Sequence, residues 1–162
     1  MTNEERERKL KNYSKAYEQV TELLREIPKD VWKYKPDKNK WSIHEIIIHL
    51  ADSEVNAYQR CRKIIAEPGS TIVFYDQDKW AENLDYHNQS TNDAVELFRL
   101  LRKMTYELLD RIPENVWKNE VIHSDGSVWS LDKWLDIYEN HITGHIEQMK
   151  RNYFEWRRIA YI

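Results

Sequence analysis

The chain has 162 residues, enough for one domain over residues 1–162. Its 25 basic and 28 acidic side chains leave a net charge of −3, and this balance argues against a nucleic-acid partner bound mainly through phosphates. Its single cysteine, Cys61, excludes an internal disulfide and suits a reducing compartment. Residues 1–6 are polar and no apolar run approaches 18 residues, so we expect a cytoplasmic protein with no signal peptide and no membrane span.

Two helices are predicted in the first part of the chain. Apolar residues that recur at steps of three and four predict a helix over residues 3–26, which Pro28 ends. A second helix is predicted over residues 42–66, because Ser42 and Glu45 match the capping-box pattern at its start and a Pro-Gly pair follows its end.

The second predicted helix has an apolar face with a polar margin. On a helical wheel, His49 lies at this margin, and Asp52 and Ser53 follow it by three and four residues. An apolar face with a polar edge is typical of a helix that borders a cleft. Asp52 and Ser53 are therefore candidates for lining a cleft beside His49, and the alternative is an ordinary polar helix margin.

Residues 67–89 form a long connection without a clear helical period. Residues 71–75 are β-prone, and residues 76–80 favour a short turn of helix. A connection of this length is either a crossover or a functional lid. We expect it to be both, with Trp80 placed over the site, and the alternative is a surface crossover that only spans the bundle.

Two more helices are predicted in the second half of the chain, over residues 90–112 and 130–158. Pro113 ends the first of them, and Ser130 is the expected N-cap of the second. The buried stripe of the helix over residues 90–112 is predicted from apolar residues at helical spacing. Its members are Ala94, Leu97, Phe98, Leu101, Leu108 and Ile112.

The sequence contains an internal repeat. The segment 27–33 (Ile-Pro-Lys-Asp-Val-Trp-Lys) matches the segment 112–118 (Ile-Pro-Glu-Asn-Val-Trp-Lys), and each is followed by a Trp-Ser pair that begins the next helix, at Trp41 and at Trp129. Each half is thus a helix, a stop, a link and a second helix. The sequence therefore predicts an all-α fold, a four-helix bundle built from two related helical hairpins with a long crossover loop.

Three histidines form a candidate metal site. His141 and His145 are four residues apart on the last predicted helix, so both side chains project from one face. Such a pair alone is more often structural, but helix geometry lets it supply two nitrogen ligands to one metal. His49, on the corresponding helix of the other half, is the best candidate for a third ligand. Gly144 is unfavourable inside a helix, which suggests that another helix or a ligand approaches closely there.

The residue types of this cluster indicate catalytic chemistry. Three neutral imidazoles leave the other positions of a metal open to water or substrate, and such a metal can lower the pKa of water or hold a thiolate. Glu45 and Gln148, each one turn from a candidate ligand, are expected either to orient the rings or to lie on solvated helix faces. The remaining candidates are expected outside the site: His44, His87 and His123 on the surface and Cys61 in the core.

These motifs resemble the DinB superfamily and, within it, the YfiT-like branch that is related to bacillithiol S-transferases. The resemblance covers nearly the whole chain. It rests on the Trp-Ser helix entries, on His49-Leu50-Ala51-Asp52-Ser53, on Tyr75-Asp76 ahead of Trp80, and on His141-x-x-Gly144-His145-x-x-Gln148.

The resemblance implies a four-helix bundle, a homodimer, and a divalent metal, zinc or nickel, held by His49, His141 and His145. It also implies a metal-dependent thiol S-transferase or hydrolase that acts on a small molecule, with a low-molecular-weight thiol as a further cofactor. It assigns no catalytic residue beyond the metal ligands. The residues 138–140 that precede His141 depart from the pattern of many relatives, and this departure bears on the substrate rather than on the metal.

Two non-enzymatic alternatives stay open at this point. In the first, the protein is a binding module whose metal only clamps the two hairpins together. In the second, it is a helical dimerisation module with a vestigial site. Metal analysis, followed by a thiol-conjugation assay with and without a chelator, separates these alternatives from an enzyme.

Overall fold

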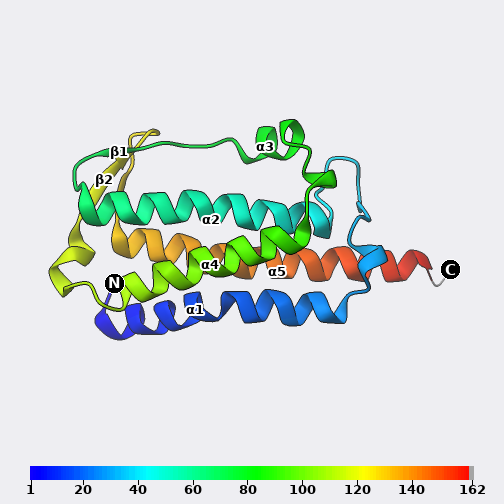
Figure 1. The fold of residues 1–162 in the computed structure, drawn as a ribbon, viewed down its shortest axis with the longest axis horizontal. Helices are drawn as coiled ribbons and strands as arrows, with labels where there is room; N and C mark the ends of the chain where they lie inside the picture. The colour runs from blue at the N-terminus through cyan, green and yellow to red at the C-terminus, as the bar shows by residue number, and fades with distance from the viewer. Residues whose placement is uncertain (161–162) are drawn as a thin grey trace.

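The computed structural model describes residues 1–160, and four long helices lie side by side along most of its length (Figure 1). They are α1 (Asn3–Glu26), α2 (Ile43–Ala66), α4 (Thr91–Leu109) and α5 (Leu131–Ala160). The helices α1 and α5 run in one direction, and α2 and α4 run in the opposite one. Both α1 and α2 pack against α4 and α5, so the two repeated halves interlock. This architecture confirms the predicted all-α four-helix bundle with its long crossover.

Short elements connect the long helices, and three of them form a small sheet that the sequence analysis did not predict. The strand β2 lies in the middle, parallel to β1 and antiparallel to β3. The sheet lies at the end of the bundle where α2 ends (Figure 1). In chain order the short elements are the 3-10 helix η1 (Lys29–Val31), β1 (Thr71–Ile72), α3 (Gln77–Asn83), the 3-10 helices η2 (Tyr86–Asn88) and η3 (Glu114–Lys118), β2 (Glu120–His123) and β3 (Val128–Ser130).

The helix boundaries follow local signals in the sequence. The α2 helix begins with the predicted capping box, in which the Ser42 hydroxyl accepts from the Glu45 N–H and the Glu45 carboxylate accepts from the Ser42 N–H. The α4 helix ends at Leu109, three residues before the predicted end at residue 112. The reason is Pro113, because a proline disfavours helical backbone in the residue before it and the chain turns ahead of it.

The long connection returns along the whole length of α2. After α2 ends, the chain passes through β1 and α3 and reaches the start of α4 at the other end of the bundle (Figure 1). The strand β1 falls within the predicted β-prone segment, and α3 falls where a short turn of helix was expected. The connection is therefore a crossover, as predicted, and it covers one side of α2.

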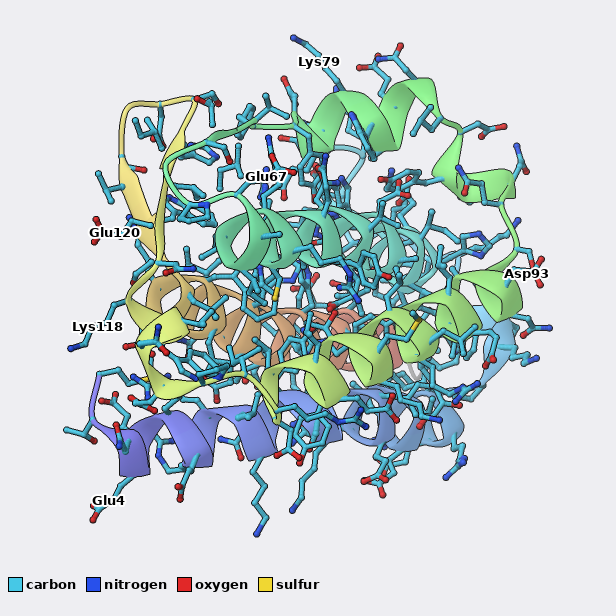
Figure 2. All side chains as sticks on the ribbon, turned by 60° about the vertical axis from the view of Figure 1, so that its left-hand side comes forward. Glu4, Glu67, Lys79, Asp93, Lys118 and Glu120 are labelled. Atoms are coloured by element: carbon cyan, nitrogen blue, oxygen red, sulfur yellow. The ribbon has the colours of Figure 1, made fainter. Side chains whose placement is uncertain are left out.

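The bundle interior is apolar and its surface is charged. Large side chains such as Trp134, Tyr13 and Phe98 are fully buried between the helices. Figure 2 shows charged side chains at the periphery, including Glu4, Lys79 and Lys118, that point away from the bundle. Among residues 1–160, no helix is both long enough and apolar enough to span a membrane.

One ion pair lies inside this apolar core. Arg102 on α4 and Glu54 on α2 are both 2% exposed, and the Arg102 Nε donates to Glu54 at 2.9 Å. The other two guanidinium nitrogens donate to the backbone carbonyls of Tyr13 on α1 and Tyr138 on α5, at 3.1 and 2.9 Å. The Tyr13 hydroxyl donates to the second carboxylate oxygen of Glu54. One guanidinium thus connects all four long helices.

This ion pair explains an error in the predicted stripe of α4. Leu97 was predicted to face the core, but it is 41% exposed, and Leu101 and Leu108 are only half-buried. The prediction used apolar residues alone and left Arg102 out of the buried face, because an arginine normally lies at the surface. The predicted buried face of α4 was therefore about one residue too early. The residues of α4 that face the core are Ala94, Phe98, Arg102, Thr105 and Leu109.

We predict that Arg102→Met lowers the free energy of unfolding by about 3 to 5 kcal/mol, because it leaves the buried Glu54 carboxylate without its positive partner. Chemical denaturation measures this loss. The double variant Arg102→Met/Glu54→Leu should recover part of it, since the uncompensated charge is gone.

The matched control is Arg99→Met on the same helix, because Arg99 pairs with Glu96 at the protein surface. An exposed pair contributes little to stability, so this variant should unfold nearly as the wild type does. A loss below about 1 kcal/mol for Arg102→Met would contradict the role assigned to the buried pair.

Candidate metal centre

Three imidazole rings from two neighbouring helices meet inside the bundle. His49 comes from α2, and His141 and His145 come from one face of α5. The Nε2 atom of His141 lies 3.1 Å from that of His49 and 3.0 Å from that of His145. Of the described residues, these three form a group whose ligand atoms all lie within 4.8 Å of one another. The structure therefore brings together all three histidines selected from the sequence.

The environment of the three rings keeps them neutral. Burial, followed by the charge of His145, lowers the pKa of His49 to about 3. Burial, followed by the charges of both other histidines and of Arg102, lowers the pKa of His141 well below its ordinary value. Burial also lowers the pKa of His145, although a hydrogen bond to Gln148 opposes the shift. A neutral imidazole has a free lone pair, which is the form that binds a metal.

The Nε2 atoms of the three histidines face one another, and there are too few N–H protons to join all of them by hydrogen bonds. The Nδ1 atom of His145 lies 3.0 Å from the side-chain oxygen of Gln148, and this contact is a hydrogen bond in the tautomer that carries its proton on Nδ1 and leaves Nε2 bare. The Nε2 atom of His141 faces both other Nε2 atoms, and a single proton there can serve only one of them. A cation among the three nitrogens would satisfy all of them at once.

The separations also suit a small divalent metal. Zinc–nitrogen bonds in tetrahedral geometry place two ligand nitrogens about 3.3 Å apart, close to the 3.1 Å between His49 and His141 and the 3.0 Å between His141 and His145. Nitrogen ligands of this kind favour zinc, nickel, copper or iron over magnesium and calcium, which prefer oxygen. The residues present therefore fit a transition-metal ion.

A tryptophan packs against two of the rings. The Trp41 ring lies 4.7 Å from the His49 ring, and it stacks nearly parallel to the His145 ring at 6.4 Å. Trp41 directly precedes Ser42, the N-cap of α2. The tryptophan of the repeated Trp-Ser motif is therefore part of the surroundings of the histidines, which the sequence analysis did not predict.

A cavity of about 250 Å³ opens beside His145. His145, Gln148 and Trp41 line one side of it, and residues 39–40 and 77–78 line the rest. Gln77 and Asp78 belong to the start of α3, so the long connection supplies one wall of this cavity. A larger groove of about 570 Å³, between α1 and the start of α4, includes none of the three histidines. Size alone therefore does not identify the site.

None of the three cleft candidates lines this cavity. Ser53 is buried on α2, with 4% of its surface exposed. Asp52 accepts a hydrogen bond from the Tyr86 hydroxyl, and burial raises the pKa of its carboxyl group. Trp80 packs against the Tyr75 ring at 4.8 Å. Their roles toward a substrate stay predictions.

Arg60 holds the long connection against α2. It lies on the same side of α2 as His49 and donates to the Tyr138 hydroxyl at 2.9 Å and to the backbone carbonyl of Val73. The Tyr138 ring in turn meets the His141 ring edge to face at 6.4 Å. Arg60 thus joins the connection, α2 and α5 beside the three rings.

Of the two residues considered for orienting the rings, Gln148 contacts a histidine and Glu45 has other partners. The Glu45 carboxylate completes the capping box and pairs with Lys35 at 2.9 Å. The Nδ1 atom of His49 is buried, with no hydrogen-bond partner in the described part of the chain. The expectation that another helix approaches Gly144 closely was wrong, because a Cβ atom there would meet no atom of another described element within 4 Å. The alternative, the close approach of a ligand, stays a prediction.

Two histidines expected at the surface are buried instead. His44, in the first turn of α2, is 8% exposed, and its ring centroid lies 5.9 Å from that of His87 on η2. His123, on β2, stacks on the Trp129 ring at 4.9 Å. Tertiary packing that the sequence does not show buries both rings. His87 is exposed, as expected, and Cys61 is fully buried, with its thiol pKa raised to about 12 by burial.

Comparison with known protein families gives one family match. The model of the DinB superfamily matches residues 12–149, which is most of the chain. A related protein, the "Putative metal-dependent hydrolase OB0782" of Oceanobacillus iheyensis, is 32% identical over 106 residues, which are 65% of this chain and 61% of the relative. The chain spans less than two thirds of the length of the first curated relatives it matches, from 61 to 66%.

Solved structures show the same fold at low sequence identity. YfiT from Bacillus subtilis, described as "a probable metal-dependent hydrolase with an unusual four-helix bundle topology", aligns with a TM-score of 0.88 at 20% identity, over 99% of this chain and 90% of YfiT. A mycothiol-dependent maleylpyruvate isomerase aligns with a TM-score of 0.71 at 12% identity, over 92% of this chain and 63% of the isomerase. Both likenesses concern the fold.

We predict that His145→Ala abolishes stoichiometric binding of a divalent metal and leaves the fold intact, because the apolar face of α5 supplies most of the stability of that helix. Metal analysis of the purified variant and its circular dichroism spectrum measure the two effects. The matched control is His87→Ala, which removes an exposed histidine and should keep the full metal content. One metal equivalent retained by His145→Ala would rule out the assignment.

Proposed function

The chain belongs to the DinB superfamily, and we propose that it is a metal-dependent enzyme in which His49, His141 and His145 hold a divalent metal ion. The single observation that supports this proposal best is the convergence of three neutral imidazole nitrogens from two helices. Zinc or nickel suits this donor set. Three protein ligands leave further positions free, as in catalytic rather than structural sites.

The residues around the histidines have defined tasks in this proposal. When bound, the metal would lower the pKa of a water or thiol ligand, so that a nucleophile forms near neutral pH. Gln148 keeps the proton of His145 on Nδ1 and so directs its Nε2 lone pair toward the other two rings. Trp41 covers the His49 and His145 rings and offers an apolar surface to a substrate in the adjoining cavity.

We propose that the reaction is hydrolysis of a small molecule or transfer of a thiol to it. The names of the relatives as metal-dependent hydrolases support the first reaction. The resemblance to thiol S-transferases supports the second, and the mycothiol-dependent isomerase is a thiol-dependent enzyme with a similar fold. In both reactions a nucleophile attacks an electrophilic carbon, so one site can carry either. The homodimer expected from the sequence stays a prediction.

We predict that activity follows metal content. The metal-loaded protein should hydrolyse an activated ester or conjugate a low-molecular-weight thiol to an aryl halide, and a chelator should lower the rate at least about tenfold, because the uncatalysed nucleophile is mostly protonated at neutral pH. The two assays, run with and without re-added metal, measure this dependence.

The alternative is a metal that only clamps the bundle, and it predicts that neither assay shows a metal-dependent rate. His49 is fully buried and would be tied by the metal to α5, so a clamp would raise the melting temperature. A protein that loses stability on chelation, but shows no metal-dependent rate in either assay, would contradict the enzyme and favour the clamp.

We also predict that Trp80→Ala lowers kcat/KM about tenfold, equivalent to about 1.4 kcal/mol, and leaves the metal content unchanged. Trp80 packs on Tyr75 and steadies the start of α3, which walls the cavity, whereas the three histidines lie on the long helices.

The control for this variant is Lys79→Ala, an exposed neighbour on the same short helix, which should keep the wild-type rate. Wild-type activity of Trp80→Ala with full metal would exclude the predicted lid role of the long connection. Loss of the metal together with activity would show that the connection supports the metal centre itself.

A further inference from the structure

A fourth polar residue continues the line of side chains that α5 directs toward the metal centre. Asn152 follows His141, His145 and Gln148 at helical spacing, so all four lie on one side of α5. The Asn152 side chain is only 5% exposed, although it is polar. Its Nδ2 atom donates to the backbone carbonyl of Trp41 at 2.8 Å. Asn152 therefore connects α5 to the chain just before α2.

The residue that Asn152 holds is the one that packs on the histidines. The Trp41 ring contacts His49 on α2 and stacks on His145 on α5. Trp41 also directly precedes the capping box that begins α2, two turns before His49. The Asn152 hydrogen bond thus fixes the backbone that carries the Trp41 ring, next to the start of the helix that supplies the His49 ring.

Within the described structure, His49 has no hydrogen bond from Nδ1 that could orient its ring, unlike His145, which has Gln148. Metal-binding histidines usually have such a partner, and its loss weakens metal binding about 10- to 100-fold. For His49, packing against the Trp41 ring takes the place of a hydrogen-bond partner at Nδ1.

We infer that Asn152 is a positioning residue of the metal centre, which acts through Trp41 to hold the His49 ring toward His141 and His145. This inference rests on the proposed metal site. A purely structural role would be to satisfy the Trp41 carbonyl, and this would change stability without changing the metal site of the folded protein.

The test is a titration of the purified full chain with cobalt(II), competed by a chelator. Its visible absorption reports both the affinity and the geometry of the site. Asn152→Leu and Trp41→Leu should each weaken cobalt binding about tenfold or more and change the absorption band. The double variant should lose less than the product of the two single losses, because both changes act on the same ring.

The control is Ile64→Val, a mild core change at the other end of α2, which should leave cobalt binding unchanged. Unchanged affinity and absorption in folded Asn152→Leu, or an equal loss in Ile64→Val, would overturn the inference. If Asn152→Leu does not fold, Trp41→Leu decides the question, since unchanged cobalt binding in that variant also overturns it. Failure of the wild-type chain to bind cobalt would instead overturn the proposed function, and the inference with it.

Discussion

The buried pair of Arg102 and Glu54 is the interaction on which the arrangement of the bundle depends. Burial of a charge costs free energy unless the charge is paired and hydrogen-bonded, so the buried Arg102 favours an arrangement of the four helices that keeps Glu54 and the Tyr13 and Tyr138 carbonyls within its reach. Through Glu54 and the Tyr138 carbonyl, it sets α2 and α5 in register. These are the two helices that carry the histidines. The positive charge of Arg102 is also among the causes that lower the pKa of His141.

Around this fixed register, each histidine is held by a different kind of contact. A hydrogen bond to Gln148 orients His145, and packing against Trp41 steadies His49. An edge-to-face contact with Tyr138 supports His141. The Tyr138 hydroxyl also accepts a hydrogen bond from Arg60, and Arg60 donates a second one to the long connection at Val73. The connection that covers α2 is therefore linked to the side chains that surround His141. The proposed metal centre is thus part of the packing of the bundle.

The features that the sequence predicted are those with local or periodic signals. Helix spacing and the Ser42 capping box act within a few residues, and they indicated the four helices. The Trp-Ser repeat recurs between the two halves, and it indicated that the helix of His49 corresponds to the helix of His141 and His145. The register of α4 was missed because Arg102 is buried only through Glu54, 48 residues away in sequence. The sheet, the burial of His44 and His123, and the contacts of Trp41 and Asn152 also depend on long-range packing, which residue types alone do not show.

The central claim is that three histidines from two helices form one metal site, and a crystal structure of the zinc-loaded protein tests it most directly. Diffraction data collected at the zinc absorption edge locate the ion independently of any model of the chain. The account predicts one anomalous peak at about 2.0 to 2.1 Å from the Nε2 atoms of His49, His141 and His145. A peak bound by other residues, or bound by the α5 histidines without His49, would contradict it.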